Sequence, residues 1–389
     1  MRKVLTYIAW GLMIVIVVIF ALMAGNALAL AVALLVVVVP VAGRIVVGRA
    51  ARTLEVTLAS PTTAQKSVPV ECVLSIRNPS VIPLLRVQAQ LHSRNMLTGQ
   101  EHDETVALGV PARGEATYRF SLESPLCGRM ELFVAELECF EPTSVFSKRV
   151  PVTAQRRFSV MPDLHECYIR EVLSAAPLSD TTMYSPYVKG NDASETFALR
   201  EYEDGDDVRR IHWKLSEKTD ELVVREASLP IDNSITVFWD KALYGTSPDP
   251  QRADALADLT LSVCQMLSEQ GMQFEVVCNE APSQQCIVQD VTSEEDIYEL
   301  IGHLISVPLA QDLESAIQLY ERSRGPVQSS RIVYICCGVP AELLNLGSQT
   351  SVMQFVCDDT VSMESGMGYC SIHFAKDDVR GALTMAGAV

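Results

Sequence analysis

The chain begins with two long apolar runs, at about residues 4–24 and 27–47, which are separated by the turn signal Gly25-Asn26. Each run is long enough to cross a hydrocarbon core of roughly 30 Å as a helix, and Pro40 in the second run is tolerated near the end of a membrane helix. The pattern predicts a transmembrane hairpin of two helices over residues 1–52.

Basic residues lie on both sides of this predicted hairpin, whereas its turn carries no charge. They are Arg2, Lys3, Arg44, Arg49 and Arg52. Because basic flanks remain in the cytoplasm, we expect a multi-pass protein of the cell membrane with two spans, whose termini and soluble domains are all cytoplasmic. A cleaved signal peptide ending at Ala27-Leu28-Ala29 competes with this interpretation, but its apolar region would be too long. A single long span is a third alternative.

Apolar and polar residues alternate along residues 53–160, which places one face of each run in a core and the other in water. Turn signals such as Pro125-Leu126-Cys127-Gly128 separate the runs. About seven short strands of this kind predict an antiparallel β-sandwich of immunoglobulin type. The clearest strands are Leu54–Leu58, Val68–Ile76, Leu85–Leu91, Ala116–Leu122 and Met130–Cys139. The patterning weakens over residues 161–198, where we expect a linker.

Strand and helix patterns alternate through residues 229–389, which predicts a mostly parallel sheet covered by helices, an α/β domain. The predicted strands are Ile235–Asp240, Phe274–Cys278, Arg331–Cys336, Val352–Cys357 and Tyr369–Phe374. The predicted helices are Arg252–Gln270, Ser293–Ile305 and Leu313–Arg322, of which the second begins with a Ser-Glu-Glu-Asp capping sequence.

Composition restricts the class of partner. The 389 residues carry a net charge of −17, and residues 1–52 contain only basic groups, so the rest of the chain is strongly acidic. Phosphate binding needs a positive surface, and a nucleic-acid partner is therefore not expected. The eleven cysteines lack the paired spacing of a disulfide framework or zinc site, and only Cys336 and Cys337 are adjacent. That usage is typical of reduced cytosolic thiols.

Residues 199–228, here called the charged segment, hold the densest run of ionisable groups. Two interpretations remain open. Carboxylates around a glycine turn could hold a divalent cation beside His212 as acid or base. Alternatively, the neighbouring arginines neutralise those carboxylates, and nearly equal opposite charges favour this ion-pair network. The candidate interaction residues are Arg200, Glu201, Tyr202, Gly205, Asp206, Asp207, Arg209, Ile211, His212, Trp213 and Lys214.

These residues resemble the signature of the domain of unknown function 58 family. Cys127-Gly128-Arg129 and Phe140–Phe146 likewise resemble the family's RG-x-Y and D-P-F-G-L-F motifs, although Glu141 stands near the usual Asp and Ser144 at the usual Gly. The resemblance covers nearly the whole chain. It implies a membrane hairpin, a sandwich-like domain, the charged segment and a von Willebrand factor A-like domain. It also implies a partner among the AAA-type ATPases of the MoxR class, near which such proteins are often encoded.

A von Willebrand A-like domain implies a magnesium site whose first strand ends in Asp-x-Ser-x-Ser. Here the corresponding run is Asp240-Lys241-Ala242-Leu243-Tyr244, and a later strand ends in Cys336-Cys337-Gly338 where Thr-Asp-Gly is usual. Asp240 remains, but the hydroxyl ligands are missing. We therefore expect a degenerate motif that binds no metal, and no cofactor.

No Gly-x-Ser-x-Gly, Walker loop or His-Glu-x-x-His motif occurs in the chain. The sequence thus favours a membrane-anchored, non-enzymatic scaffold that binds the lipid bilayer and a protein partner, with no catalytic residues and no small-molecule substrate. The alternative is a metal-assisted hydrolase that uses the acidic residues of the segment 201–212, namely Glu201, Asp204, Asp206, Asp207 and His212.

Overall fold

The structure is a computed structural model of the chain. It describes all residues except 1, 25–26, 170–182, 202–210, 213–214, 217–221, 232–234, 282, 328, 346–349, 359, 367 and 389, and it gives only the backbone for residues 2–6, 24, 183–201, 225–231, 344–345 and 388. The chain forms two compact units, Met1–Pro162 and Asp163–Val389.

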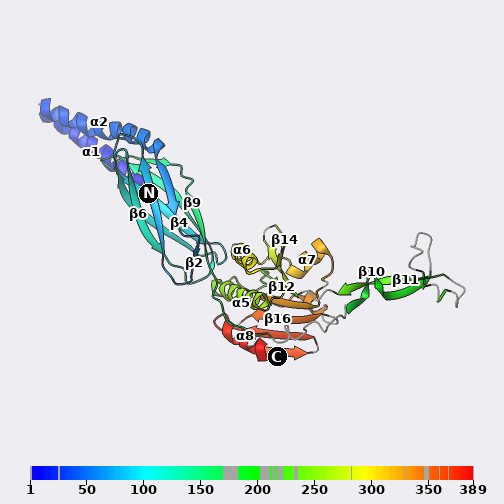
Figure 1. The fold of residues 1–389 in the computed structure, drawn as a ribbon. Helices are drawn as coiled ribbons and strands as arrows, with labels where there is room; N and C mark the ends of the chain where they lie inside the picture. The colour runs from blue at the N-terminus through cyan, green and yellow to red at the C-terminus, as the bar shows by residue number, and fades with distance from the viewer. Residues whose placement is uncertain are drawn as a thin grey trace. The chain divides into compact units, whose positions relative to one another are not determined.

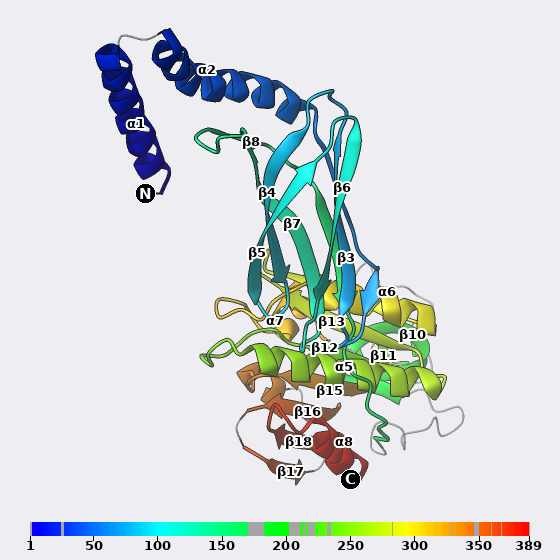
Figure 2. The same ribbon diagram turned by 90° about the vertical axis from the view of Figure 1, so that its left-hand side faces the viewer.

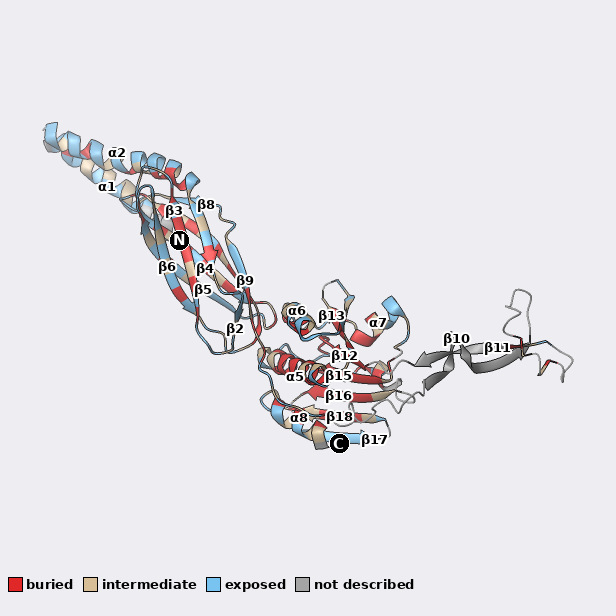
Figure 3. Cartoon of the chain, in the orientation of Figure 1, coloured by how far each residue is buried: buried red, intermediate tan, exposed pale blue. Residues whose placement is uncertain are grey.

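The first unit begins with helices α1 (Arg2–Ala24) and α2 (Ala27–Ala50) (Figure 1). Among the described residues, the helical stretch Ala27–Thr53 is long and apolar enough to cross a membrane, with a mean hydropathy of 2.7. Tyr7–Met23 within α1 is a shorter apolar stretch. Large apolar side chains of both helices are exposed (Figure 3), so this region has the surface that membrane association requires.

The rest of the first unit is built from two β-sheets (Figure 2). One has the strand order β1-β3-β6, and the other has the order β2-β9-β7-β4-β5, with β8 paired to β7. All pairs are antiparallel except β2 with β9. The strands are β1 (Glu55–Ala59), β2 (Thr63–Ala64), β3 (Val70–Asn78), β4 (Leu84–Asn95), β5 (Glu101–Val110), β6 (Gly114–Leu122), β7 (Gly128–Phe140), β8 (Ser147–Val150) and β9 (Gln155–Val160).

A single hydrophobic core joins the two sheets. Leu74 and Ile76 of β3 belong to the same buried cluster as Val87 of β4 and Leu137 of β7. These residues alternate with exposed or half-buried ones along each strand, which is the period-two pattern of the sequence. The five strands predicted most clearly are present here as β1, β3, β4, β6 and β7.

The structure differs from the linker predicted over residues 161–198. Residues 183–201 form strand β10 (Met183–Glu201), which pairs antiparallel with β11 (Val223–Ile231). The pairing is irregular where the patterning of the sequence weakens, with register shifts between Tyr184 and Lys189 and between Lys189 and Asp192. Pairing between segments distant in sequence decides such a strand, and local turn residues do not reveal it.

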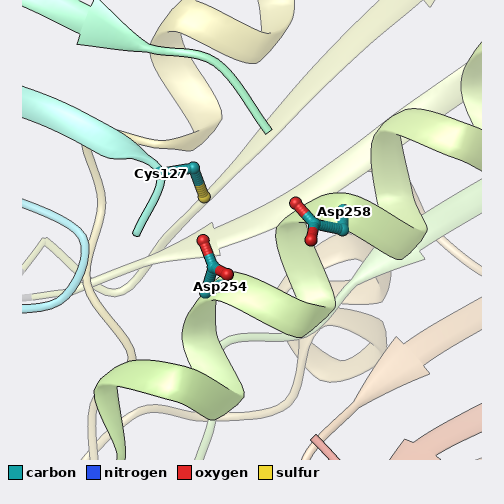
Figure 4. Close-up of side chains that lie close together, drawn as sticks. All are labelled: Cys127, Asp254 and Asp258. Atoms are coloured by element: carbon teal, nitrogen blue, oxygen red, sulfur yellow. The ribbon is translucent and has the colours of Figure 1, made fainter. Parts of the chain in front are cut away.

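Residues 163–169 also depart from a free linker, because their backbone follows helix α5 (Pro250–Glu269). The amide of Asp163 donates to Oδ1 of Asp258 at 2.9 Å, and the amide of His165 donates to Oγ of Ser262 at 3.0 Å. Asp254 and Asp258 lie on successive turns of α5 (Figure 4). Residues four apart lie on the same face of an α-helix. Asp258 and Ser262 therefore face the same way, and the extended segment 163–169 can bond to both.

The remainder of the second unit is a seven-stranded sheet with helices. The strand order is β14-β13-β12-β15-β16-β18-β17, parallel from β13 to β18 and antiparallel at both edges. Helix α5 contacts β12, β15 and β16, while α7 contacts β12, β13 and β14. The elements are β12 (Ile235–Trp239), β13 (Phe274–Glu280), β14 (Gln285–Val291), α6 (Glu294–Leu304), α7 (Ala316–Arg324), β15 (Arg331–Cys336), η3 (Ala341–Asn345), β16 (Ser351–Cys357), β17 (Ser362–Gly366), β18 (Tyr369–Phe374) and α8 (Val379–Ala388).

The predicted parallel strands and helices of this unit are all present. The capping sequence before α6 also forms as predicted: Oγ of Ser293 accepts from the amide of Asp296, and the Asp296 carboxylate accepts from the amide of Ser293. Strands β14 and β17 and helix α8 are additional. Both extra strands are antiparallel sheet edges, and β17 is exposed throughout, so it lacks the apolar run of a central strand.

Candidate functional site

Most of the predicted interaction residues lie outside the described part of the chain. These are Tyr202, Gly205, Asp206, Asp207, Arg209, Trp213 and Lys214. Arg200 and Glu201 end strand β10, opposite Val224 and Val223 of β11. The question of a cation site or an ion-pair network in the charged segment therefore remains a prediction.

Ile211 and His212 are described, and both join the charged segment to β11. Ile211 is buried and forms an antiparallel bridge with Val224. The amide of His212 donates to the carbonyl of Val223 at 2.7 Å. Nδ1 of His212 accepts from the amide of Leu215 at 3.3 Å, which leaves the proton of the neutral ring on Nε2. His212 thus closes a turn here, and only Nε2 remains for a ligand.

The sheet of the second unit has a topological switch point between β12 and β15. From β12 the chain continues to β13 and β14 on one side, then crosses to β15, β16 and β18 on the other. In open α/β sheets, ligands bind outside the carboxyl ends of the strands at such a point. Asp240 directly follows β12, and Cys337 and Gly338 directly follow β15. The degenerate motif of the sequence therefore lies where a site is expected.

The Asp240 side chain at this switch point is fully buried, and donors surround its carboxylate. Oδ1 accepts from the amide of Ala242 at 2.9 Å and from Nδ2 of Asn279 at 2.7 Å. Oδ2 accepts from the hydroxyls of Tyr244 and Tyr334. Each carboxylate oxygen already has two donors, so a metal ion could bind only by displacing one of them.

Burial raises the pKa of Asp240, and the hydrogen bonds from Tyr244, Tyr334, Ala242 and Asn279 oppose the rise without cancelling it. Burial likewise raises the pKa of Tyr334 well above the usual value, and the nearby Asp240 charge adds to this effect. Burial and the Asp240 charge raise the pKa of Tyr244 in the same way, so both phenols stay protonated and act as donors at neutral pH. The cluster is arranged to satisfy a carboxylate, with no deprotonated nucleophile.

Tyr244 covers this carboxylate from a left-handed backbone conformation, with φ at +46°. That conformation is rare for a bulky residue, and such strain concentrates at positions that the surrounding structure fixes. Its side chain packs so closely against Gly338 that a β-carbon there would lie 2.9 Å from Cβ of Tyr244. Gly338 is thus needed for Tyr244 to occupy this position, because any other residue there would displace the Tyr244 side chain.

Lys241 lies beside Asp240 in sequence but is directed elsewhere. Its fully buried side chain donates from Nζ to the carbonyls of Leu304 and Val307, at the carboxyl end of α6, and Nζ lies 4.0 Å from the ring centroid of Trp239. A cation at this end of a helix is favourable because the carbonyls there are unpaired within the helix. Lys241 therefore stabilises the packing of α6.

The adjacent thiols at the switch point are not bonded to one another. None of the eleven cysteines, all of them in the described part of the chain, forms a disulfide, and nine of them are buried. Burial raises the pKa of Cys337 to about 12, and it raises the pKa of Cys336 well above its usual value. Protonated, buried thiols are poor nucleophiles and poor metal ligands. This pair belongs to the core.

Sequence reasoning identified Asp240 but missed Asn279 and Tyr334, which hold its carboxylate. Asn279 lies near the carboxyl end of β13 and is fully buried, as is Tyr334 within β15. A polar residue at the end of an otherwise apolar parallel strand was the available signal, since such ends meet at one edge of a sheet.

Comparison with known families decides what kind of chain this is. Residues 198–325, which include the charged segment, Asp240 and Asn279, match the family described as Protein of unknown function DUF58. The match places this third of the chain, residues 198–325, in that family. No curated protein matches it.

Solved structures resemble parts of this DUF58 protein only weakly. A CARDB domain from Pyrococcus furiosus, in complex with di-metal ions, is 13% identical and has a TM-score of 0.21, with 28% of this chain and 89% of that chain covered. A β-glucosidase from Listeria innocua, in complex with isofagomine, is 17% identical with a TM-score of 0.20, covering 28% of this chain and 16% of that chain. Scores this low carry no argument about fold or ligand.

The segment Phe140–Phe146, whose sequence resembles a motif of the family, forms the end of β7 and the β7–β8 loop. Ser144, where the resemblance implies glycine, takes a left-handed conformation with φ at +58°, which glycine adopts more easily than other residues. The buried Glu141 carboxylate accepts from the amides of Thr143 and Val145, both at 2.6 Å, and of Phe146 at 3.1 Å. Burial would raise the pKa of Glu141, but these bonds and the Thr143 hydroxyl outweigh it, and the pKa is lowered.

Proposed function

We propose that this DUF58 protein is a membrane-anchored, non-enzymatic interaction protein of the cell membrane. Helices α1 and α2 would both span the bilayer as a hairpin, with both termini and the soluble units in the cytoplasm. The first unit would provide an immunoglobulin-like sandwich and the second a von Willebrand factor A-like domain. The bound partner would be an AAA-type ATPase of the MoxR class, which the family resemblance implies.

One observation carries the non-enzymatic proposal: donors from the protein itself occupy the switch-point carboxylate. Two phenols, one amide side chain and one backbone amide point at Asp240, and none of its surface is exposed. A catalytic or metal-binding carboxylate needs an oxygen open to its ligand. The edge of the sheet at Asp240 is thus better suited to maintaining a rigid surface for a partner than to catalysis or metal binding.

A binding assay tests this proposal. The full-length protein in lipid nanodiscs is titrated with a purified MoxR-class ATPase from the same genome, and we expect saturable binding. The double substitution of Asp206 and Asp207 by Asn should weaken this binding if the charged segment contacts the partner. Glu294→Gln with Glu295→Gln makes the same charge change in the exposed first turn of α6, and it should leave binding unchanged.

Calorimetry separates this proposal from the hydrolase alternative. Magnesium, manganese or calcium added to the full-length protein should show no site of millimolar or tighter affinity. A cation site that the Asp206 and Asp207 double variant abolishes, while the fold stays intact, would contradict the scaffold proposal. Digestion of both soluble units by a protease added outside intact cells would contradict the cytoplasmic orientation.

A further inference from the structure

The β7–β8 loop, Glu141–Phe146, packs against both N-terminal helices within the first unit. The Phe146 ring centroid lies 5.8 Å from that of Tyr7 and 5.1 Å from that of Trp10, both on α1. The guanidinium carbon of Arg44, on α2, lies 5.5 Å from the same centroid. A single aromatic side chain of the β-sheet region thus contacts both helices.

A cavity of about 480 Å³ lies beside this contact, between the helices and the loop. Its lining is almost entirely apolar and includes Trp10 and Met13 of α1, Val39 and Pro40 of α2, and Val145 of the loop. Ligand pockets typically measure roughly 300–1,000 Å³, so the cavity is large enough for part of a lipid. An apolar lining favours a hydrocarbon occupant over a polar one.

Trp10 contributes a polar atom to this apolar setting. Its indole Nε1 is buried and has no hydrogen-bond partner among the described residues. A buried donor without a partner is unfavourable, and indole N–H groups near a membrane interface usually find an oxygen acceptor. The ester and phosphate oxygens of a phospholipid are such acceptors.

Basic side chains lie at one end of the cavity. Arg44 is four residues beyond Pro40, one helical turn further along the same face of α2. Arg49 of α2 and Lys148 of β8 are also exposed, and β8 contacts α2. The Glu141 side chain, which lies beside Gly43 of α2, is buried, and its carboxylate accepts from donors of its own loop. Arg44 thus offers a cation to an anionic group one helical turn beyond Pro40.

We infer that this cavity binds one anionic phospholipid of the bilayer. An acyl chain occupies the apolar part between α1, α2 and Val145, the indole N–H of Trp10 donates to a lipid oxygen, and the phosphate pairs with Arg44. The cytoplasmic leaflet, where basic flanks are expected, is also the leaflet rich in anionic lipid. This inference rests on the membrane anchoring proposed above and is independent of the protein partner.

Native mass spectrometry of the full-length protein in mild detergent tests the inference. Delipidated protein is titrated with dioleoylphosphatidylglycerol or with dioleoylphosphatidylcholine, which has the same acyl chains and no net charge. We expect one tightly held phosphatidylglycerol, bound at least about fivefold more tightly than phosphatidylcholine, the preference that one basic group near a membrane surface provides.

Two substitutions locate the site. Arg44→Gln should remove the preference for phosphatidylglycerol. Trp10→Phe should weaken the binding of both lipids, because it keeps an aromatic side chain but removes the indole N–H. The control is Arg94→Gln, which makes the same charge change at an exposed residue near the carboxyl end of β4. An extended strand rises about 3.3 Å per residue, so Arg94 lies about 30 Å from Leu84, the first residue of β4. It should bind like the wild type.

Equal affinity for the two lipids, or an equal effect of Arg44→Gln and Arg94→Gln, would overturn the inference. Extraction of wild-type membranes with alkaline carbonate tests the membrane anchor independently of the lipid site. A protein that stays in the membrane but shows no lipid preference contradicts the lipid site alone. A protein released by carbonate contradicts the membrane anchor as well.

Discussion

Asn279 of β13 holds Asp240 and Lys241, the two residues that follow the neighbouring strand β12, with one hydrogen bond to each. Its Nδ2 donates to Oδ1 of Asp240 at 2.7 Å, and its Oδ1 accepts from the amide of Lys241, also at 2.7 Å. Nδ2 also lies 2.8 Å from the carbonyl of Glu314, just before α7. One buried amide thus connects β12, β13 and the start of α7.

Asn279→Ala should therefore be strongly destabilising. It removes one of the two donors to Oδ1 of Asp240 and leaves the buried amide of Lys241 without its acceptor, and we expect a loss of about 2–4 kcal/mol in the free energy of unfolding. Urea denaturation of the purified protein measures the change. The control Gln285→Ala, at an exposed position of β14, should stay within about 0.5 kcal/mol of the wild type. A loss below about 1 kcal/mol for Asn279→Ala would contradict the bonding described.

Stability of the second unit should depend on pH through Asp240. Its folded pKa is raised above the usual value of 3.8 by burial. The native state thus holds this proton more tightly than the unfolded state does, and its contribution to stability is complete below pH 3.8 and is lost as pH rises through the folded pKa. Asp240→Asn removes this term, so the wild type should lose stability relative to the variant with rising pH.

Urea denaturation of wild type and Asp240→Asn at several pH values between about 4 and 8 checks this sign, whatever the absolute stability of the variant. Parallel pH profiles for the two proteins would show that the carboxyl is already ionised throughout this range. The prediction would then be wrong.

Ser144→Gly should stabilise the first unit. A left-handed conformation costs an ordinary residue about 1–2 kcal/mol, and the greater freedom of glycine in the unfolded chain offsets part of this, leaving a gain of about 0.5–1 kcal/mol. Thermal unfolding measures the gain. Ser144→Ala keeps the unfavourable φ of +58° and is the matched control, for which we expect no gain.

Gly128→Ala should disrupt the start of β7. A β-carbon there would lie 2.0 Å from Oδ1 of Asn95, and this oxygen accepts from the amides of Leu97 and Thr98 at 3.0 and 3.2 Å. We expect a loss of more than about 3 kcal/mol, because the side chain must move and its bonds break.

Gly99→Ala is the matched control for this substitution. Gly99 also has a positive φ, at +72°, but a β-carbon there would meet nothing within 4 Å. We expect a loss of only about 1 kcal/mol from backbone strain. Similar losses for the two variants would show that the Asn95 contact is unimportant, and guanidinium denaturation compares them directly.

Local patterns in the sequence were sufficient for elements whose burial follows a simple period. Strands such as Arg331–Cys336 are present with the predicted bounds, and Ser293 caps α6 as predicted. The edge strand β17, exposed throughout, and the segment 163–169 along α5 were missed. Edge strands have few apolar residues, and bonds to a distant helix leave no periodic signal.

The sequence by itself determined the family, the apolar N-terminal region and the absence of serine ligands after Asp240, because each depends on which residues are present and in what order. Only the tertiary structure decided what occupies the Asp240 carboxylate. Tyr244, Asn279 and Tyr334 are separated by tens of residues, and the parallel register of β12, β13 and β15 brings them to one point. Such a convergence depends on strand pairing, which no local pattern specifies.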